Sequence, residues 1–118
     1  METYIRLFRC IQPWLNRQYN RMGILGIQAS MILSLTTEKV KEQHELVNAL
    51  GLRKGTISKA VEQLVANGYI KIERQRGDKR IRVLWSTHKA YYLSKQIRSL
   101  HHMIEEILLE DCLAGTSE

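Results

Sequence analysis

Residues 50–87 decide the fold, and they read LGLRKGTISKAVEQLVANGYIKIERQRGDKRIRVLWST. In the first half of this stretch, apolar side chains recur at helical spacing from Ile57 to Val65. The pattern ends at Asn67-Gly68, a pair typical of helix C-termini. This half therefore predicts a helix with one apolar and one polar side.

The second half has a different period. Apolar and polar residues alternate over residues 69–74 and again over residues 81–85, which predicts two strands. Residues 75–80 between them contain a Gly-Asp pair and several basic side chains, as expected for the tip of a β-hairpin. We expect a basic hairpin directly after the helix.

More helices precede this stretch. Residues 43–50 place apolar side chains on one face and stop at Gly51, which can take the left-handed backbone of a tight turn. Two helices joined by a short glycine-containing turn form a helix-turn-helix, and a following hairpin forms its wing. Residues 4–22 predict an amphipathic helix that kinks or restarts at Pro13, and residues 27–35 predict a more buried helix.

A last helix begins near Lys89, where apolar residues recur at steps of three and four. Such a seam packs either in the chain's own core or against a second copy, and the apolar face of residues 4–22 adds to the surface that must be covered. Closed two-fold dimers are the commonest oligomers, so we expect a homodimer. Its contacts would come from Phe8, Ile11, Leu15, Leu93, Ile97, Leu100, Ile104 and Ile107.

The size and composition fit one folded domain. The chain has 118 residues, of which 44% are hydrophobic and 25% are charged, with one Pro and seven Gly. We expect an α+β fold, mainly α, with a winged helix-turn-helix over residues 25–88. An N-terminal dimerisation helix over residues 1–24 and a C-terminal one over residues 89–118 would flank it.

The net charge of +6 is concentrated in one block. Residues 53–82 hold nine basic and three acidic residues, whereas the rest of the chain holds nine of each. A segment that carries the whole excess of positive charge is suited to binding a polyanion such as DNA. Each phosphate that a basic side chain neutralises releases condensed counterions, which favours binding. A solvated basic face is the alternative interpretation.

Other classes of protein find less support. The longest apolar stretch, residues 24–35, is too short and too interrupted to span a bilayer, and Arg6 and Arg9 interrupt any secretory signal. We therefore expect a cytoplasmic protein without membrane contact. The sequence contains no glycine-rich phosphate loop, HExxH or GxSxG motif, so we expect neither an enzyme nor a cofactor.

The sequence leaves open whether the protein responds to metals, to oxidation or to small molecules. Cys10 and Cys112 lack a ligand spacing, and the neighbouring His101 and His102 point about 100° apart on a helix, so no metal site is predicted. A regulator that responds to metal or oxidation through Cys10 or the region of His101 and His102 is an alternative interpretation. Five aromatic side chains either line an effector pocket or belong to the core: Trp14, Tyr19, Trp85, Tyr91 and Tyr92.

In their order and spacing, the motifs resemble the MarR family of bacterial and archaeal winged helix-turn-helix regulators. The resemblance runs from about residue 22 to residue 89. Its parts are Met22-Gly23-Ile24, ELVNALG at residues 45–51, Thr56-Ile57-Ser58-Lys59 and Gly77-Asp78-Lys79-Arg80. It implies a homodimer whose first and last helices interlock, and whose recognition helices enter successive major grooves of a pseudo-palindromic duplex site.

The resemblance also implies roles for single residues. Asp78 would pair with a nearby arginine and steady the hairpin. Arg53 stands where the family has a hydroxyl residue at the start of the recognition helix, so the cap must come from Thr56, from water or from a DNA phosphate. The residues that would contact DNA bases and phosphates are Thr56, Ser58 and Lys59, and those that would reach the minor groove are Lys79 and Arg80.

We therefore expect a sequence-specific DNA-binding transcriptional regulator that acts as a homodimer on duplex DNA, a repressor rather than an activator. The alternative is a winged-helix module that binds DNA without sequence preference or docks a protein partner, and a small-molecule effector is a further possible partner. The candidate DNA contacts are Arg53, Lys54, Thr56, Ser58, Lys59 and Gln63 in the recognition helix, and Arg76, Asp78, Lys79 and Arg80 in the wing.

Overall fold

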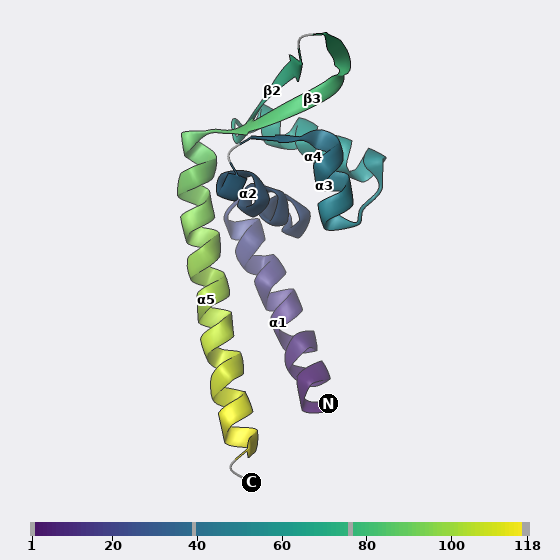
Figure 1. The fold of residues 1–118 in the computed structure, drawn as a ribbon. Coiled ribbons are helices and arrows are strands. Elements are labelled where there is room, and N and C mark those ends of the chain that lie inside the picture. Colours follow the sequence, from purple (N-terminus) through teal and green to yellow (C-terminus); the bar gives the residue numbers. More distant parts are fainter. Residues whose placement is uncertain (1, 39, 76, 117–118) are drawn as a thin grey trace.

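The computed structural model describes residues 2–38, 40–75 and 77–116, and within these ranges the chain forms five helices and three strands (Figure 1). The elements are α1 (Glu2–Arg21), α2 (Gly26–Glu38), β1 (Val40–Glu42), α3 (Gln43–Leu50), α4 (Lys54–Ala66), β2 (Ile70–Gln75), β3 (Asp78–Ser86) and α5 (His88–Thr116). The expected fold class is confirmed: the protein is mainly helical, with a helix-turn-helix followed by a β-hairpin wing.

The molecule is elongated, with principal extents of 62 × 25 × 21 Å. The hairpin and the helices α3 and α4 lie at one end, while α1 and α5 extend away from them toward the other, where both chain ends lie (Figure 1). The helix α5 packs on α2, which connects it to the winged part. We call the two extending helices, α1 and α5, the stalk. Within the described residues, no helix combines the length and the apolar character that a membrane span requires.

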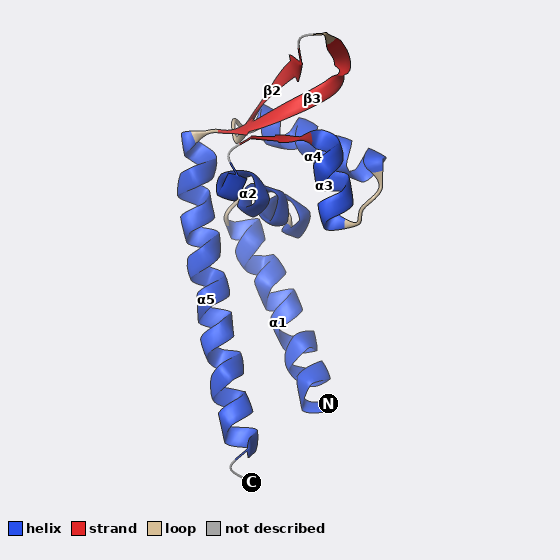
Figure 2. Cartoon of the chain, viewed as in Figure 1, coloured by secondary structure: helices blue, strands red, loops and turns tan. Residues whose placement is uncertain are grey.

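The sheet has three antiparallel strands in the order β1-β3-β2, drawn in red in Figure 2. Trp85 in the central strand pairs with Val40 on one side and with Lys71 on the other. The sequence did not predict β1, because three residues are too few to show an alternation. The hairpin is also longer than predicted, since β2 extends to Gln75 and β3 begins at Asp78, with a register shift after Arg74.

Two predicted features of the helices can be compared with the structure. Of the kink or restart predicted at Pro13, the restart is wrong, because α1 runs as one helix from Glu2 to Arg21. Arg9 and Pro13 are both exposed, so water can solvate the carbonyl group of Arg9 that has no helical donor. The turn after α3 is as predicted: Gly51 has a left-handed backbone (φ 65°), and its N–H donates to the carbonyl of Val47.

The core lies between α2, the helix-turn-helix, the sheet and the first half of α5. Its fully buried side chains include Met31, Ile32, Leu46, Ile57, Val61, Leu64, Leu84 and Ile97. Leu93, Ile97 and Leu100 were expected in a dimer seam, but the chain itself buries them, leaving 8%, 0% and 6% of each residue exposed. Their place is therefore in the chain's own core, because α2 already covers this part of α5.

Candidate nucleic-acid interface

The start of α4 is open to a ligand of negative charge. Arg53 occupies the N-cap with an extended backbone (φ −70°, ψ 147°), and its side chain makes no hydrogen bond to the helix. The first amide groups of an α-helix lack helical acceptors and carry a partial positive charge. Arg53 and Lys54, both exposed, add two cations at this helix end.

The rest of α4 divides into two faces, as the sequence predicts. Ile57, Ala60, Val61 and Leu64 are buried in the core. Thr56 and Lys59 are exposed on the polar side, and Lys54, also exposed, is the first residue of the helix. The helix therefore presents a short row of hydroxyl and ammonium groups to solvent, which is the chemistry that contacts phosphates and base edges.

Ser58 is half-buried, unlike its exposed neighbours. Its hydroxyl oxygen accepts a hydrogen bond from Nε2 of Gln43 at 3.0 Å. The carboxamide oxygen of Gln43 in turn faces the guanidinium of Arg82 at 3.4 Å. Gln43, at the start of α3, thus lies between the recognition helix and the wing. Sequence analysis missed it because its partners are distant along the chain.

Gln63 is exposed like Thr56 and Lys59, but unlike them it is hydrogen-bonded to another helix. Its carboxamide oxygen accepts a hydrogen bond from Nε2 of Gln28 in α2 at 2.9 Å. It lines a cavity of about 370 Å³ at the junction of α1 and α2, together with Asn20 and Asn67. Helical spacing placed Gln63 on the face of Thr56, but its side chain is engaged with α2 instead.

The wing has one defined ion pair at its tip. The carboxylate of Asp78 accepts a hydrogen bond from the Arg80 backbone N–H at 3.0 Å and another from the Arg80 guanidinium at 3.1 Å. These bonds hold the pKa of Asp78 below its ordinary value, the side-chain bond contributing most. Asp78 thus pairs with an arginine as the family resemblance implies. Lys79 lies in β3 beside Arg80, and Arg76 lies outside the described residues.

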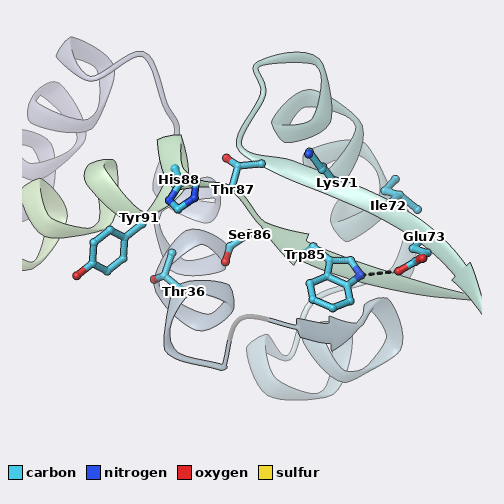
Figure 3. Close-up of a pocket in the computed structure, with 9 residues that line it drawn as sticks. All are labelled: Thr36, Lys71, Ile72, Glu73, Trp85, Ser86, Thr87, His88 and Tyr91. Atoms are coloured by element: carbon cyan, nitrogen blue, oxygen red, sulfur yellow. Dashed lines mark hydrogen bonds between the residues drawn. The ribbon is translucent and has the colours of Figure 1, made fainter.

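A cavity of about 950 Å³ opens where the wing joins α5 (Figure 3). Trp85 and Tyr91 line it from two sides, together with Thr36 of α2. The indole N–H of Trp85 donates to the carboxylate of Glu73 at 2.9 Å. Of the five aromatic residues expected in either a pocket or the core, Trp85 and Tyr91 therefore share a pocket. Its mixture of aromatic faces and a few polar groups is typical of small-molecule sites.

Tyr19, by contrast, is buried in the core and forms a contact within the stalk. Its hydroxyl group is hydrogen-bonded to Nε2 of His101 in α5. Burial raises the pKa of Tyr19. Burial also lowers the pKa of His101, against the opposing charge of Glu105. A neutral ring that carries its proton on Nδ1 would accept the Tyr19 O–H at Nε2.

We expect this contact to make the folded chain less stable in mild acid. The folded state holds the pKa of His101 below its ordinary value of about 6.5, so the unfolded chain binds the proton more readily. Stability is therefore complete above about pH 6.5 and falls as the pH drops through and below that value. Urea unfolding of the protein and of His101→Gln at several pH values measures the effect.

The variant should lose the part of this dependence on pH that comes from His101, whereas His102→Gln should keep that part. His102 is exposed and pairs with Glu106 at 3.2 Å on the outside of α5. Equal slopes for the protein and His101→Gln would contradict the prediction.

His101 of α5 contacts Tyr19, while His102 contacts Glu106. Within the described residues, one group of three brings possible metal-ligand atoms within 4.8 Å of one another, namely Glu42, His44 and Glu45. These residues surround the start of α3 and are exposed or half-buried. Such groups are common on protein surfaces without an ion.

The stalk carries unusual exposed apolar side chains. Phe8 of α1 is 66% exposed, and Ile107 of α5 is 44% exposed. Between the two helices lie grooves of about 310 and 280 Å³. Ile104 lines both grooves, Leu15 lines the first and Ile107 the second. Unlike Leu93 and its neighbours, these residues lie where the chain leaves apolar surface uncovered.

Comparisons with known proteins bear on this arrangement. The family model of the MarR family matches residues 23–81 of the chain. Comparison with curated protein sequences finds no match.

Several solved structures have the same fold. A MarR transcriptional regulator from Methanosarcina mazei Go1 is 26% identical, with a TM-score of 0.80 over 92% of this chain and 78% of that one. The transcriptional regulator BldR from Sulfolobus solfataricus is 23% identical, with a TM-score of 0.75 over 99% and 88%. A mutant MarR from E. coli complexed with operator DNA is 16% identical, with a TM-score of 0.71 over 98% and 91%. With its helix-turn-helix, its wing and half of its length matched by the family model, the chain belongs to the MarR family of transcriptional regulators.

Proposed function

We propose that the protein is a sequence-specific repressor that binds a two-fold duplex site as a homodimer. The observation that carries the proposal is the joint placement of the open start of α4 and the wing. Gln43 contacts both Ser58 of α4 and Arg82 of β3, so the two basic elements are held together at one end of the molecule. That end contains the block of residues 53–82 with the whole excess charge.

Each element has a role in this proposal. The polar side of α4 enters the major groove, where Thr56, Ser58 and Lys59 contact bases and phosphates. Lys54 and Arg53 anchor phosphates at the helix start, whose unsatisfied amides also favour an anion. Lys79 and Arg80 extend from the wing to the neighbouring minor groove.

The stalk supplies the dimer contacts. Phe8, Ile11, Leu15, Ile104 and Ile107 line or flank the grooves between α1 and α5, and a second copy would cover them. A two-fold dimer places two recognition helices on one side of a duplex, about one helical turn apart. A dimer bound over a promoter excludes polymerase, which is why we propose a repressor.

Selection from a random duplex library at physiological salt tests the function. The expected result is enrichment of a two-fold motif with half-sites about one helical turn apart. Binding without enrichment would support the non-specific or partner-docking module instead, because phosphate contacts alone retain every sequence equally.

The wing has its own test. Arg80→Ala should weaken binding to the selected site and reduce the slope of log Kd against log salt by about one to two, since each of two protomers loses one phosphate contact worth about 0.9. Titrations at four or more salt concentrations measure the slope. Arg21→Ala, which removes an exposed arginine at the end of α1, is the matched control and should change neither value. An unchanged slope for Arg80→Ala would remove the wing from the interface.

A further inference from the structure

One buried polar side chain joins the recognition helix to the rest of the molecule. Gln28 in α2 is only 4% exposed, and both ends of its carboxamide are engaged. Its oxygen accepts from the backbone N–H of Leu25 at 2.9 Å, and its nitrogen donates to Oε1 of Gln63 at 2.9 Å. The bond spans 35 positions of sequence and connects α2 with the last turns of α4.

Gln28 connects the start of α2 with α4. Leu25 directly precedes α2, and Gln28 is the third residue of that helix, so its side chain caps the helix by reaching back to the N-cap N–H. The helix α2 in turn packs on α5 of the stalk. A connection therefore runs from the stalk through α2 and Gln28 to Gln63 on the recognition helix.

The burial of Gln28 and the directionality of its hydrogen bond favour one fixed orientation of α4 relative to α2. Gln28 is buried, so its amide nitrogen would lose its partner away from bulk water if the pair separated, whereas Gln63 is the exposed end of the bond. Apolar contacts such as those of Leu64 specify distance better than direction, and a second hydrogen bond, from the ammonium group of Lys89 in α5 to the carbonyl of Asn67 at 2.6 Å, holds the C-cap of α4. A hydrogen bond, in contrast, depends on the angle between donor and acceptor.

We propose that Gln63 and Gln28 form a positioning pair that sets the orientation of α4 relative to the stalk. This rests on the proposed function: in a dimer, the orientation of each α4 relative to its stalk determines the separation of the two recognition helices. The pair thereby sets which half-site spacing the dimer accepts. Gln63 acts through Gln28 and not through a contact with DNA.

The first test uses the selected duplex and variants of its half-site spacing. Gln63→Leu removes the acceptor at similar volume and should lower affinity for the selected site about tenfold. It should leave affinity for unrelated duplex, and the salt slope, unchanged within about twofold, since no phosphate contact is lost. The preference for one spacing over a spacing changed by one base pair should become flatter, which a merely destabilised fold would not produce.

Two further variants separate the possible roles. Gln63→Glu keeps an acceptor oxygen for Gln28 and should restore most of the affinity and the spacing preference. If Gln63 touched DNA, the added negative charge would make this variant worse than Gln63→Leu and would overturn the proposal. Gln28→Leu combined with Gln63→Leu should lose no more of the spacing preference than Gln63→Leu alone, because the bond between the two side chains is already absent; the lost cap on the Leu25 N–H lowers stability instead. Additive losses would also overturn it. Gln96→Leu, at an exposed position of α5, is the control.

A second test needs no DNA. Spin labels at Glu62→Cys on α4 and Gln96→Cys on α5, both exposed positions, report the distance between recognition helix and stalk in a chain with Cys10→Ser and Cys112→Ser. Dilution with unlabelled chain isolates the distance within one protomer. Gln63→Leu should broaden the distance distribution and Gln63→Glu should not. Unchanged distributions would overturn the positioning role even if the DNA experiment failed because no specific site exists.

Discussion

Ile107→Glu is expected to convert the protein from a dimer to a monomer and to lower affinity for the selected duplex on the order of 100-fold. Ile107 lines the groove between α1 and α5 and is 44% exposed, so the folded chain tolerates a charge there. In a two-fold dimer, however, two carboxylates would enter the apolar interface together. Burying unpaired charge is strongly unfavourable, and a monomer loses the gain from engaging two half-sites at once.

Sedimentation equilibrium and duplex titration of the same samples measure the two effects. Leu109→Glu is the matched control, because Leu109 lies on the opposite side of the same helix and is 62% exposed. It introduces the same charge on α5 and should leave both the dimer and the affinity intact. A dimer that survives Ile107→Glu with unchanged affinity would place the interface away from this groove.

The local parts of the fold were predictable from the sequence. The apolar spacing from Ile57 to Val65 predicted α4, and Gly51 predicted the turn before it. Both features depend on residues that are close together in the sequence. The pairing of Asp78 with Arg80 is likewise local, since the two residues are two positions apart.

Contacts between distant segments were not predictable. The strand β1 is three residues long and exists through its pairing with β3, so no local pattern marks it. Leu93, Ile97 and Leu100 have the spacing of a dimer seam, but the same spacing serves a helix that packs on its own α2. Spacing specifies which face is apolar without specifying what covers it.

The polar side of α4 also combines local features that the sequence predicts with a distant contact that it does not. Gln63 follows Thr56 by seven positions and so shares its stripe on the helix, which made it a candidate contact. Its partner Gln28 lies 35 positions earlier, and the hydrogen bond between them turns the side chain toward α2. Thr56 and Lys59 have no such partner among the hydrogen bonds of the described residues and stay exposed.

The second prediction with a large expected effect concerns Lys59. Lys59→Glu should raise the Kd for the selected duplex on the order of 100-fold and reduce the salt slope by about two, since both protomers exchange a phosphate contact for a repulsion. Lys59 is exposed on the polar side of α4, one turn beyond the basic start of the helix, so the substitution leaves the core unchanged. Fluorescence anisotropy over a range of salt concentrations gives both values.

Net charge alone cannot explain such a result if the control behaves as expected. Lys95→Glu makes the same change of charge on an exposed residue of α5, in the stalk. Screening limits its influence on a duplex to about 10 Å at ordinary salt, so we expect its Kd to stay within about threefold of the parent. Equal losses for the two variants would mean that the duplex responds to total charge, and α4 would then have no special place in binding. A loss confined to Lys59→Glu would place the duplex on the polar face of α4, because the apolar face of the helix is buried in the core.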